Sequence, residues 1–314
     1  MWYRSKDRRM EGGKEMAGIS RREFMGGAAA VAAAAALPVV RTEPARACAS
    51  GALCGITVNK GAYGVSSYLT AAKIADGYVG LPLAVTFEKV YMGHGQFTMP
   101  EKVAELKPAG CQFLISTKPS TTRTVSQQKA LARWLAMLKQ KGVKFRCALY
   151  SEPNDKAFLT AAEWLPYWRY YAPVIKDAGC TLVYEPGCGG ALARGEALFP
   201  SKPYPDEMWV DFYCTGYRGG SRLNAILGIA HAAGVPSGIG EWGWQAGNAK
   251  DPGKPPTMAI WDEYGTYLLG LIGARKITLG ATYFDARFGE LTSNVITGPN
   301  DPRIPMIKKM AKAL

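Results

Sequence analysis

The feature that most constrains the fold of this chain is the regular alternation of short apolar runs with longer helix-like runs. After residue 50, eight runs of strand length occur, and each is followed within three residues by glycine, proline or a charged residue. Strands that alternate with helices usually pair in parallel, so the pattern predicts an α/β protein rather than a β-sandwich. The expected strands are Gly55–Lys60, Thr86–Met92, Cys111–Ser116, Lys144–Tyr150, Thr181–Tyr184, Trp209–Cys214, Pro236–Gly240 and Thr278–Tyr283.

Several runs between these strands show helical periodicity. In the run Ser126–Lys141, apolar side chains recur every three or four positions, at Leu131, Trp134, Leu135 and Leu138. Eight units of strand and helix are the number in a (β/α)8 TIM barrel, a fold of roughly 250 residues. We therefore predict a single α/β domain of this type over residues 48–314. Further helices are expected at Ala161–Ala178, Arg222–Ala233, Met258–Arg275 and Ile304–Leu314.

The first 47 residues have the composition of an export signal. The twin arginines Arg21 and Arg22 precede an alanine-rich apolar run, Gly26–Val40, and a small-x-small cleavage site follows at Ala45–Ala47. The apolar run is shorter than the roughly 20 residues of a membrane-spanning helix. We therefore expect a twin-arginine signal peptide over residues 1–47, a secreted protein, and no stable membrane anchor.

The cysteine content agrees with an exported protein. Seven cysteines are present, and an odd number leaves at least one outside any internal pair. Two disulfides are expected: Cys48 with Cys54, which would close a short loop, and Cys188 with Cys214, which would join the ends of neighbouring strands.

Other classes of protein have little support in the sequence. The chain has only two histidines and no Cys-x-x-Cys motif, so we expect no metal. It also lacks the Gly-x-Ser-x-Gly motif of serine hydrolases and the glycine-rich loops that bind phosphate, so no cofactor is expected. The formal net charge of +13 is scattered along the chain, which does not favour nucleic-acid binding. We expect a monomer.

Two glutamates stand where such a barrel would have its active site. Glu152 follows the fourth expected strand, and Glu241 follows the seventh. Active sites of these barrels lie at the C-terminal ends of the strands. Pro153 is expected to hold Glu152 on a stiff, extended turn. Two carboxyl groups that face each other across a cleft can cleave a glycosidic bond.

Two motifs carry a resemblance to a known group. The stretch Tyr150–Asn154 looks like the strand-four motif of clan A glycoside hydrolases, and Gly238–Gly243 is similar to their strand-seven motif. Together with Val210–Tyr217, the second motif looks closest to glycoside hydrolase family 26, the β-mannanase family. The chain departs from the pattern at Ser151, where most of the clan has asparagine, and it shows no arginine after Tyr91 near strand two.

The resemblance implies a secreted retaining glycoside hydrolase. Glu152 would be the general acid/base and Glu241 the nucleophile, with Tyr217 hydrogen-bonded to the nucleophile. The substrate would be a polysaccharide with β-glycosidic bonds, β-mannan or a related β-glycan, cleaved by endo-action.

Further residues near the strand ends are candidates for sugar binding. Sugar rings stack on aromatic planes and their hydroxyl groups need polar partners. An alternative is a degenerate barrel that binds carbohydrate without cleaving it, an idea motivated by Ser151. The candidates are aromatic, namely Tyr213, Trp242, Trp244 and Tyr283, or polar, namely His94, Lys118 and Asp285.

Overall fold

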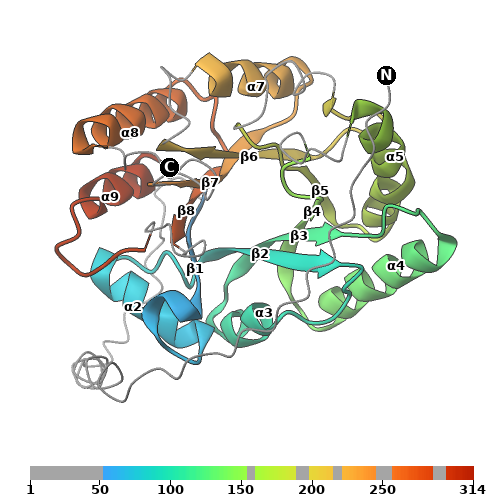
Figure 1. Ribbon diagram of the computed structural model, residues 1–314, viewed down its shortest axis with the longest axis horizontal. Coiled ribbons are helices and arrows are strands. Elements are labelled where there is room, and N and C mark those ends of the chain that lie inside the picture. Colours follow the sequence, from blue (N-terminus) through green and yellow to red (C-terminus); the bar gives the residue numbers. More distant parts are fainter. Residues whose placement is uncertain (1–51, 154–159, 189–197, 215–220, 245–256, 286–294) are drawn as a thin grey trace, which may run out of the picture. The chain divides into compact units, whose positions relative to one another are not determined.

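The computed structural model describes residues 52–153, 160–188, 198–214, 221–244, 257–285 and 295–314. Eight strands form one parallel sheet in the order β1-β8-β7-β6-β5-β4-β3-β2, so the first and last strands of this order lie beside each other in a barrel (Figure 1). The strands are β1 (Leu53–Val58), β2 (Phe87–His94), β3 (Gln112–Lys118), β4 (Lys144–Leu149), β5 (Thr181–Tyr184), β6 (Glu207–Tyr213), β7 (Ser237–Gly243) and β8 (Gly280–Asp285).

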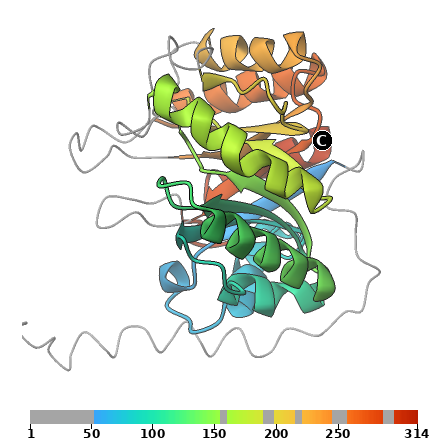
Figure 2. The same cartoon turned by 90° about the vertical axis from the view of Figure 1, so that its right-hand side faces the viewer.

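Helices surround these strands and confirm the predicted (β/α)8 fold (Figures 1 and 2). Five of them lie within two residues of their predicted bounds. The sequence reasoning missed α2 and α3, because α3 is short and the buried face of α2 consists largely of alanines. The helices are α2 (Tyr68–Val79), α3 (Glu101–Leu106), α4 (Val125–Gln140), α5 (Ala161–Asp177), α7 (Ser221–Ala232), α8 (Met258–Gly273) and α9 (Ile304–Ala313).

The helix ends follow from local sequence. Thr160 begins α5 with a capping box, in which its hydroxyl accepts from the Glu163 N–H and the Glu163 carboxylate accepts from the Thr160 N–H. Ser67, Thr124 and Thr257 cap other helices in the same way with one side-chain bond.

Side chains close the barrel between β1 and β2. The Val58 N–H donates to the Glu88 carboxylate (3.1 Å), and the Lys89 N–H donates to the Thr57 hydroxyl (3.2 Å). Lys102 donates to both the Glu88 carboxylate (3.1 Å) and the Val58 carbonyl (2.5 Å). β1 and β2 are not joined by a ladder of backbone hydrogen bonds. These side-chain bonds therefore satisfy buried backbone groups that such a ladder would otherwise satisfy.

The inside of the barrel has an apolar layer and a polar layer. Successive side chains of a strand point to opposite faces, so residues two apart share the interior. The polar layer lies two residues further along the strands than the apolar layer. It includes Lys89, two residues after Phe87, and Asp211, two residues after Trp209. The apolar layer consists of Leu53, Phe87, Leu114, Ala148, Val183 and Trp209.

Large aromatic side chains fill the space between the strands and α5. The Trp164 and Trp168 rings are fully buried, and each indole N–H donates 2.8 Å to a backbone carbonyl, of Leu198 and Pro203 respectively. A buried indole needs such a partner. Trp134 on α4 is likewise buried, so the aromatic helix residues serve packing.

The described cysteines do not form the second expected disulfide. Cys214 carries a free, buried thiol, so the predicted Cys188–Cys214 bond is wrong, and no disulfide joins two described cysteines. Both residues lie at the C-terminal ends of their strands, as expected, but neighbouring strand ends do not by themselves give disulfide geometry. Cys48 lies outside the described residues, so its pairing with Cys54 stays a prediction.

None of the helices in the described part of the chain is long and apolar enough to cross a membrane.

We expect the Gly55→Ala substitution to destabilise the barrel. A Cβ at this position would lie 2.0 Å from the Phe87 carbonyl oxygen, so β1 and β2 would have to separate. Overpacking of this kind costs about 1–3 kcal/mol or more of unfolding free energy. The control is Gly77→Ala in α2, where a Cβ meets nothing within 4 Å and helix propensity should raise stability by about 0.5–1 kcal/mol. Urea unfolding measures both, and equal stability of the two variants would contradict this account.

Candidate active site

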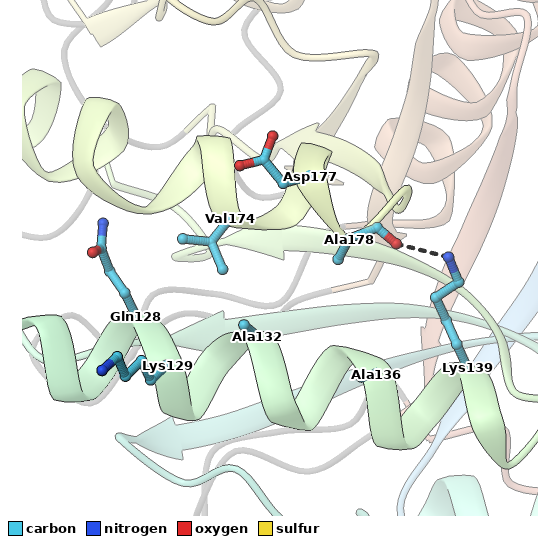
Figure 3. A pocket seen from close by; sticks show the side chains of 8 residues that line it. All are labelled: Gln128, Lys129, Ala132, Ala136, Lys139, Val174, Asp177 and Ala178. Atoms are coloured by element: carbon cyan, nitrogen blue, oxygen red, sulfur yellow. Dashed lines mark hydrogen bonds between the residues drawn. The ribbon is translucent and has the colours of Figure 1, made fainter.

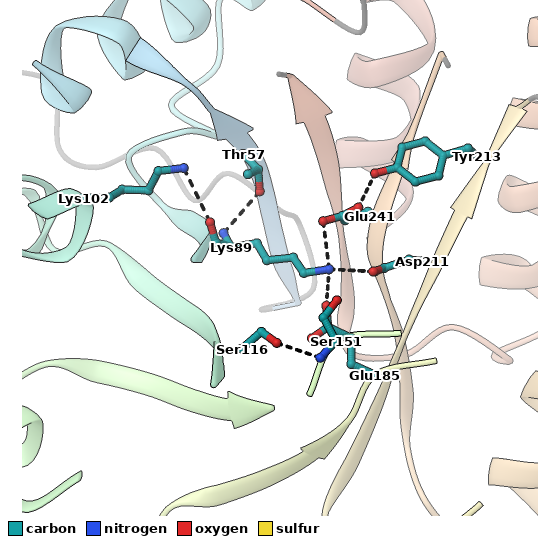
Figure 4. Close-up of polar contacts among 9 residues, drawn as sticks. All are labelled: Thr57, Lys89, Lys102, Ser116, Ser151, Glu185, Asp211, Tyr213 and Glu241. Carbon is teal, nitrogen blue, oxygen red and sulfur yellow. Dashed lines mark hydrogen bonds and ion pairs between the residues drawn. The ribbon is translucent and has the colours of Figure 1, made fainter. Parts of the chain in front are cut away.

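A buried lysine lies at the centre of the polar layer. The Lys89 ammonium is within 2.7 and 2.9 Å of the two Asp211 carboxylate oxygens and 2.9 Å of Glu241 Oε1, and it also contacts Glu185 Oε1 (Figure 4). The side chains of all four residues are at most 4% exposed. One ammonium therefore binds three carboxyl groups that come from strands or strand ends far apart in sequence.

The strand β2 places Lys89 inside the barrel. Phe87, two residues earlier, belongs to the apolar layer, and Lys89 follows it on the same face. The bond of its N–H to Thr57 fixes the backbone. The sequence reasoning found no strand-two arginine after Tyr91 and did not consider Lys89, which lies two residues before it.

A β-bulge turns Glu241 towards this lysine. On β7, Ile239 pairs with Val210 but Glu241 pairs with Asp211, so Gly240 is an extra residue. A bulge shifts the inward and outward alternation by one position and often re-aims a side chain beside an active site. Glycine is required there, because a Cβ at Gly240 would lie 2.6 Å from Asp211 Oδ1.

The Glu241 carboxylate has a second donor besides Lys89. The Tyr213 hydroxyl, from β6, donates to Glu241 Oε2 (Figure 4). The resemblance implies this hydrogen bond for Tyr217, which lies outside the described residues, whereas Tyr213 is one of the predicted sugar-binding residues. In the structure the phenol that contacts Glu241 is that of Tyr213.

Glu152 lies on an unusual turn after β4. Its φ is 50° and that of Tyr150 is 63°, both in the left-handed region, which costs about 1–3 kcal/mol each for residues other than glycine. The expected extended geometry before Pro153 is therefore wrong. Two bonds impose the turn: the Glu152 N–H donates to the Glu185 carbonyl (2.8 Å), and the Ser151 N–H donates to the Ser116 hydroxyl (2.9 Å). Strained backbone that is held in this way is frequent at functional sites.

Burial and the shared lysine set the ionisation of the cluster. Burial raises the pKa of Asp211, Glu185 and Glu241, while the Lys89 ammonium opposes the rise in each. Burial alone would lower the pKa of Lys89, but the three carboxylates raise it well above its ordinary value. Lys89 therefore stays charged. With one ammonium for three buried carboxyl groups, ionising all three carboxyl groups is energetically unfavourable.

Two of the predicted sugar-binding residues lie together beside Tyr150. The Lys118 ammonium is 5.2 Å from the centre of the Tyr150 ring, and the His94 ring is 5.9 Å from it. Both residues come from the ends of β3 and β2, and His94 is exposed. They line the same rim of the barrel as Glu152.

The aromatic residues of β7 and β8 divide between packing and the rim. Trp242 is 2% exposed and stacks on Trp261 of α8 (5.6 Å, 9°). Tyr283 is fully buried and meets Trp242 edge to face. The bulge explains this placement, because it points Glu241 inward and its neighbour Trp242 outward. Trp244 is partly exposed and packs against Trp261.

Asp285 occupies the end of β8 but is already bound within the fold. Its carboxyl accepts from the Tyr63 hydroxyl and, at 2.8 Å, from the Ile296 N–H. Burial raises its pKa to about 7. In the described part of the chain, no group of three or more histidine, cysteine, aspartate or glutamate side chains could hold a metal ion.

An opening of about 410 Å³ lies at the β1 and β2 ends, and Lys89 is the one residue of the cluster that lines it. Its lining includes Lys89, Thr57 and Phe284, and also Tyr91, which is 43% exposed with its ring 5.0 Å from the Lys89 ammonium. An exposed aromatic ring beside buried carboxylates is suited to contact a sugar.

A second groove lies on the outer wall of the barrel. It occupies about 590 Å³ between α4 and α5, which pack side by side (Figures 2 and 3). Its floor is formed by small residues such as Ala132 and Ala136, and a hydrogen bond of 2.7 Å from Lys139 to the Ala178 carbonyl lies at one end. The groove contains no cluster of ionisable groups comparable with that at the strand ends, so we place the candidate site at the strand ends.

Sequence comparison confirms the export signal. The family model for the twin-arginine translocation pathway signal sequence matches residues 18–38, so the chain is exported by the twin-arginine route. The chain matches no curated protein.

Comparison with solved structures finds other barrels. A GH128 (subgroup I) endo-beta-1,3-glucanase from Amycolatopsis mediterranei, in complex with laminaritriose, is 15% identical with a TM-score of 0.50 over 83% of this chain and 100% of that chain. A fungal beta-1,4-galactanase is 10% identical with a TM-score of 0.55, over 76% and 91%. Saccharomyces cerevisiae Gas2p, with laminaritetraose and laminaripentaose, is 12% identical with a TM-score of 0.52, over 83% and 63%.

These three neighbours are clan A glycoside hydrolases with a TIM-barrel fold. At such low identities the likeness shows the fold, and the residues of the site must carry the argument for function. None of the three is a family 26 enzyme, so the closer likeness to that family stays a prediction.

We expect Lys89→Met to destabilise the protein in a pH-dependent way. Removing the ammonium leaves three buried carboxyl groups without their cation, a change that costs about 3–5 kcal/mol of unfolding free energy. The folded state then retains protons that the unfolded chain releases above a pKa of about 4, so the loss grows as the pH rises and is smallest in acid.

Urea unfolding at pH 5 and pH 8 measures this loss. The control is Lys176→Met, which breaks an exposed pair with Asp206 and should cost at most about 1 kcal/mol at either pH. A pH-independent loss in the Lys89 variant would contradict the account.

Proposed function

We propose that this protein is an exported retaining glycoside hydrolase that cleaves β-glycosidic bonds of a polysaccharide. The observation that carries the proposal is the environment of Glu241. Its carboxylate is buried at the end of β7 and is bound by Lys89 and Tyr213. Glu152 follows the end of β4 on the same rim of the barrel. The barrel neighbours, which are glycosidases acting on β-glycans, support the same class.

The two glutamates divide the chemistry of a double displacement. Glu152, in its acid form, protonates the glycosidic oxygen as the bond breaks, and Glu241 attacks the anomeric carbon. A glycosyl-enzyme ester results. Glu152, now a carboxylate, removes a proton from a water molecule that hydrolyses this ester, so the configuration at the anomeric carbon is retained. Glu241 must be ionised to attack, and the two donors on its oxygens favour that form.

For the substrate we propose a β-glycan taken along an open groove by endo-action. The structural neighbours include complexes with laminari-oligosaccharides and a β-1,4-galactanase, and the sequence motifs resemble those of β-mannanases. The exposed Tyr91 ring next to the cluster offers a stacking surface for a sugar of any of these chains. A panel of β-1,3-glucan, β-1,4-galactan and β-mannan therefore separates the candidates.

We expect Glu152→Gln and Glu241→Gln each to lower turnover at least about a thousandfold on the responsive glycan, since each removes a reacting group. The amide keeps the size of the side chain, so the melting temperature should change little. The matched control is Glu105→Gln, which exchanges a carboxylate of α3 that binds Ser67. Product analysis by NMR should show the β-anomer first; an α-anomer would contradict retention. Binding of the panel without product release would support the degenerate barrel instead.

We expect Tyr213→Phe to move the acid limb of the kcat/KM profile to higher pH. The phenol donates to the ionised form of Glu241, so its loss raises the pKa of that carboxyl. A lost hydrogen bond to a charged group costs about 1.5–3 kcal/mol, or roughly a 10–100-fold fall in kcat/KM at neutral pH. Tyr204→Phe, at a tyrosine that is 52% exposed, should leave the profile unchanged. A limb that stays in place in the Tyr213 variant would show that this bond does not tune Glu241.

A further inference from the structure

The lysine cluster has a charge imbalance that the two-glutamate mechanism does not use. If every group were ionised, the single positive charge of Lys89 would face the three negative charges of Glu185, Asp211 and Glu241 at depths where at most 4% of each side chain is exposed. Unbalanced buried charge is very costly, and such groups take up a proton instead.

The three carboxyl groups differ in their donors. Glu241 has the Tyr213 hydroxyl in addition to the Lys89 ammonium. Within the described residues, neither oxygen of Glu185 has a hydrogen-bond partner beyond its ion pair with Lys89. In the same part of the chain, the Asp211 carboxylate accepts two hydrogen bonds, both from Lys89. Donors stabilise the ionised form, so Glu241 is the group best able to remain a carboxylate.

The surroundings increase the repulsion at the other two groups. Glu185 and Asp211 both lie against the same ammonium, and when both are ionised their charges repel each other. The other ionisable groups near the cluster in the described part of the chain include Glu152 after β4 and Lys118 of β3, which both act on Glu185, together with Tyr213 of β6 and Tyr91 of β2, whose ring is 5.0 Å from the Lys89 ammonium. Two carboxyl groups that share a site titrate as a pair, and one proton between them removes the repulsion.

We propose that Glu185 and Asp211 hold one proton between them, and that Lys89 is thereby a positioning residue that keeps Glu241 ionised. In this state the Glu185–Asp211 pair carries one negative charge and Glu241 carries another. The Lys89 ammonium lies against both of these charges. The role assigned to Glu241 rests on the proposed function; the shared proton does not.

The shared proton predicts that replacing either carboxyl group by an amide changes the number of protonated carboxyl groups but not the net charge of the cluster. In Glu185→Gln the remaining Asp211 loses the proton, and in Asp211→Asn the remaining Glu185 loses it. Each single variant therefore lacks one protonated carboxyl group but keeps the net charge of the cluster. The double variant lacks no further protonated carboxyl group, and its cluster is more positive by one charge.

Infrared difference spectroscopy of the full mature protein at neutral pH distinguishes protonated carboxyl groups from carboxylates and needs no substrate. We expect each single variant to lose one carboxylic-acid band of equal size, and the double variant to lose no more than either. Glu101→Gln, at an exposed carboxylate paired with Lys60, should lose none. Two unchanged single variants, a loss in only one of them, or additive losses in the double variant would overturn the proposal.

The pH dependence of kcat/KM is a second, independent test of the shared proton. Each single variant should keep the acid limb of kcat/KM in place, while the double variant should move it to lower pH, because one negative charge near Glu241 is gone. A limb that already moves to lower pH in both single variants would mean that both carboxyl groups were ionised, which overturns the proposal. The expected infrared result in a protein that cleaves no glycan would instead refute the proposed function and leave the shared proton established.

Discussion

The contact of the Lys89 ammonium with three carboxyl groups is the interaction on which the candidate site depends. It joins β2 to the ends of β5, β6 and β7 across the barrel. Because an uncompensated charge in this layer would cost several kcal/mol, the geometry of the strand ends and the ionisation of Glu241 are linked. A substitution at any one of these four residues should therefore change the pKa values of the other three.

Local departures from regular strands shape the chain at Glu241 and at Glu152, the two candidate catalytic residues. The extra residue Gly240 turns Glu241 inward, and the left-handed backbone at Tyr150 and Glu152 turns the chain at the end of β4. Both features cost backbone stability. The hydrogen bonds from Ser151 and Glu152 to neighbouring strands hold the second one in place, so the rigid barrel supports strain that a free loop would relax.

Much of the fold could be predicted from the sequence, because alternating apolar runs and helical periodicity are local properties. Seven strands were found within two residues of their bounds; β7 extends three residues beyond its expected end at Gly240, so Glu241 lies near the end of the strand rather than after it, while Glu152 follows β4 as expected. Lys89 was missed because a lysine inside an apolar strand reads as an exposed residue, and only the three-dimensional arrangement brings the carboxyl groups to it. Trp242 and Tyr283 were expected at the cleft because aromatic residues concentrate near the strand ends and Trp242 follows the expected nucleophile. The bulge at Gly240, which the sequence signals only by that glycine, instead turns Trp242 towards Trp261 of α8.

We expect Glu241, which is bound by Lys89 and Tyr213, to form a covalent bond to the sugar. The most direct measurement is mass spectrometry of the protein after reaction with a 2-deoxy-2-fluoro glycoside built on the glycan that it cleaves, a reagent that slows breakdown of the ester. We predict one sugar per protein, attached to the peptide that contains Glu241 and to that carboxyl group. A label on Glu152 or Glu185, or turnover of the glycan without any trapped ester, would contradict this account.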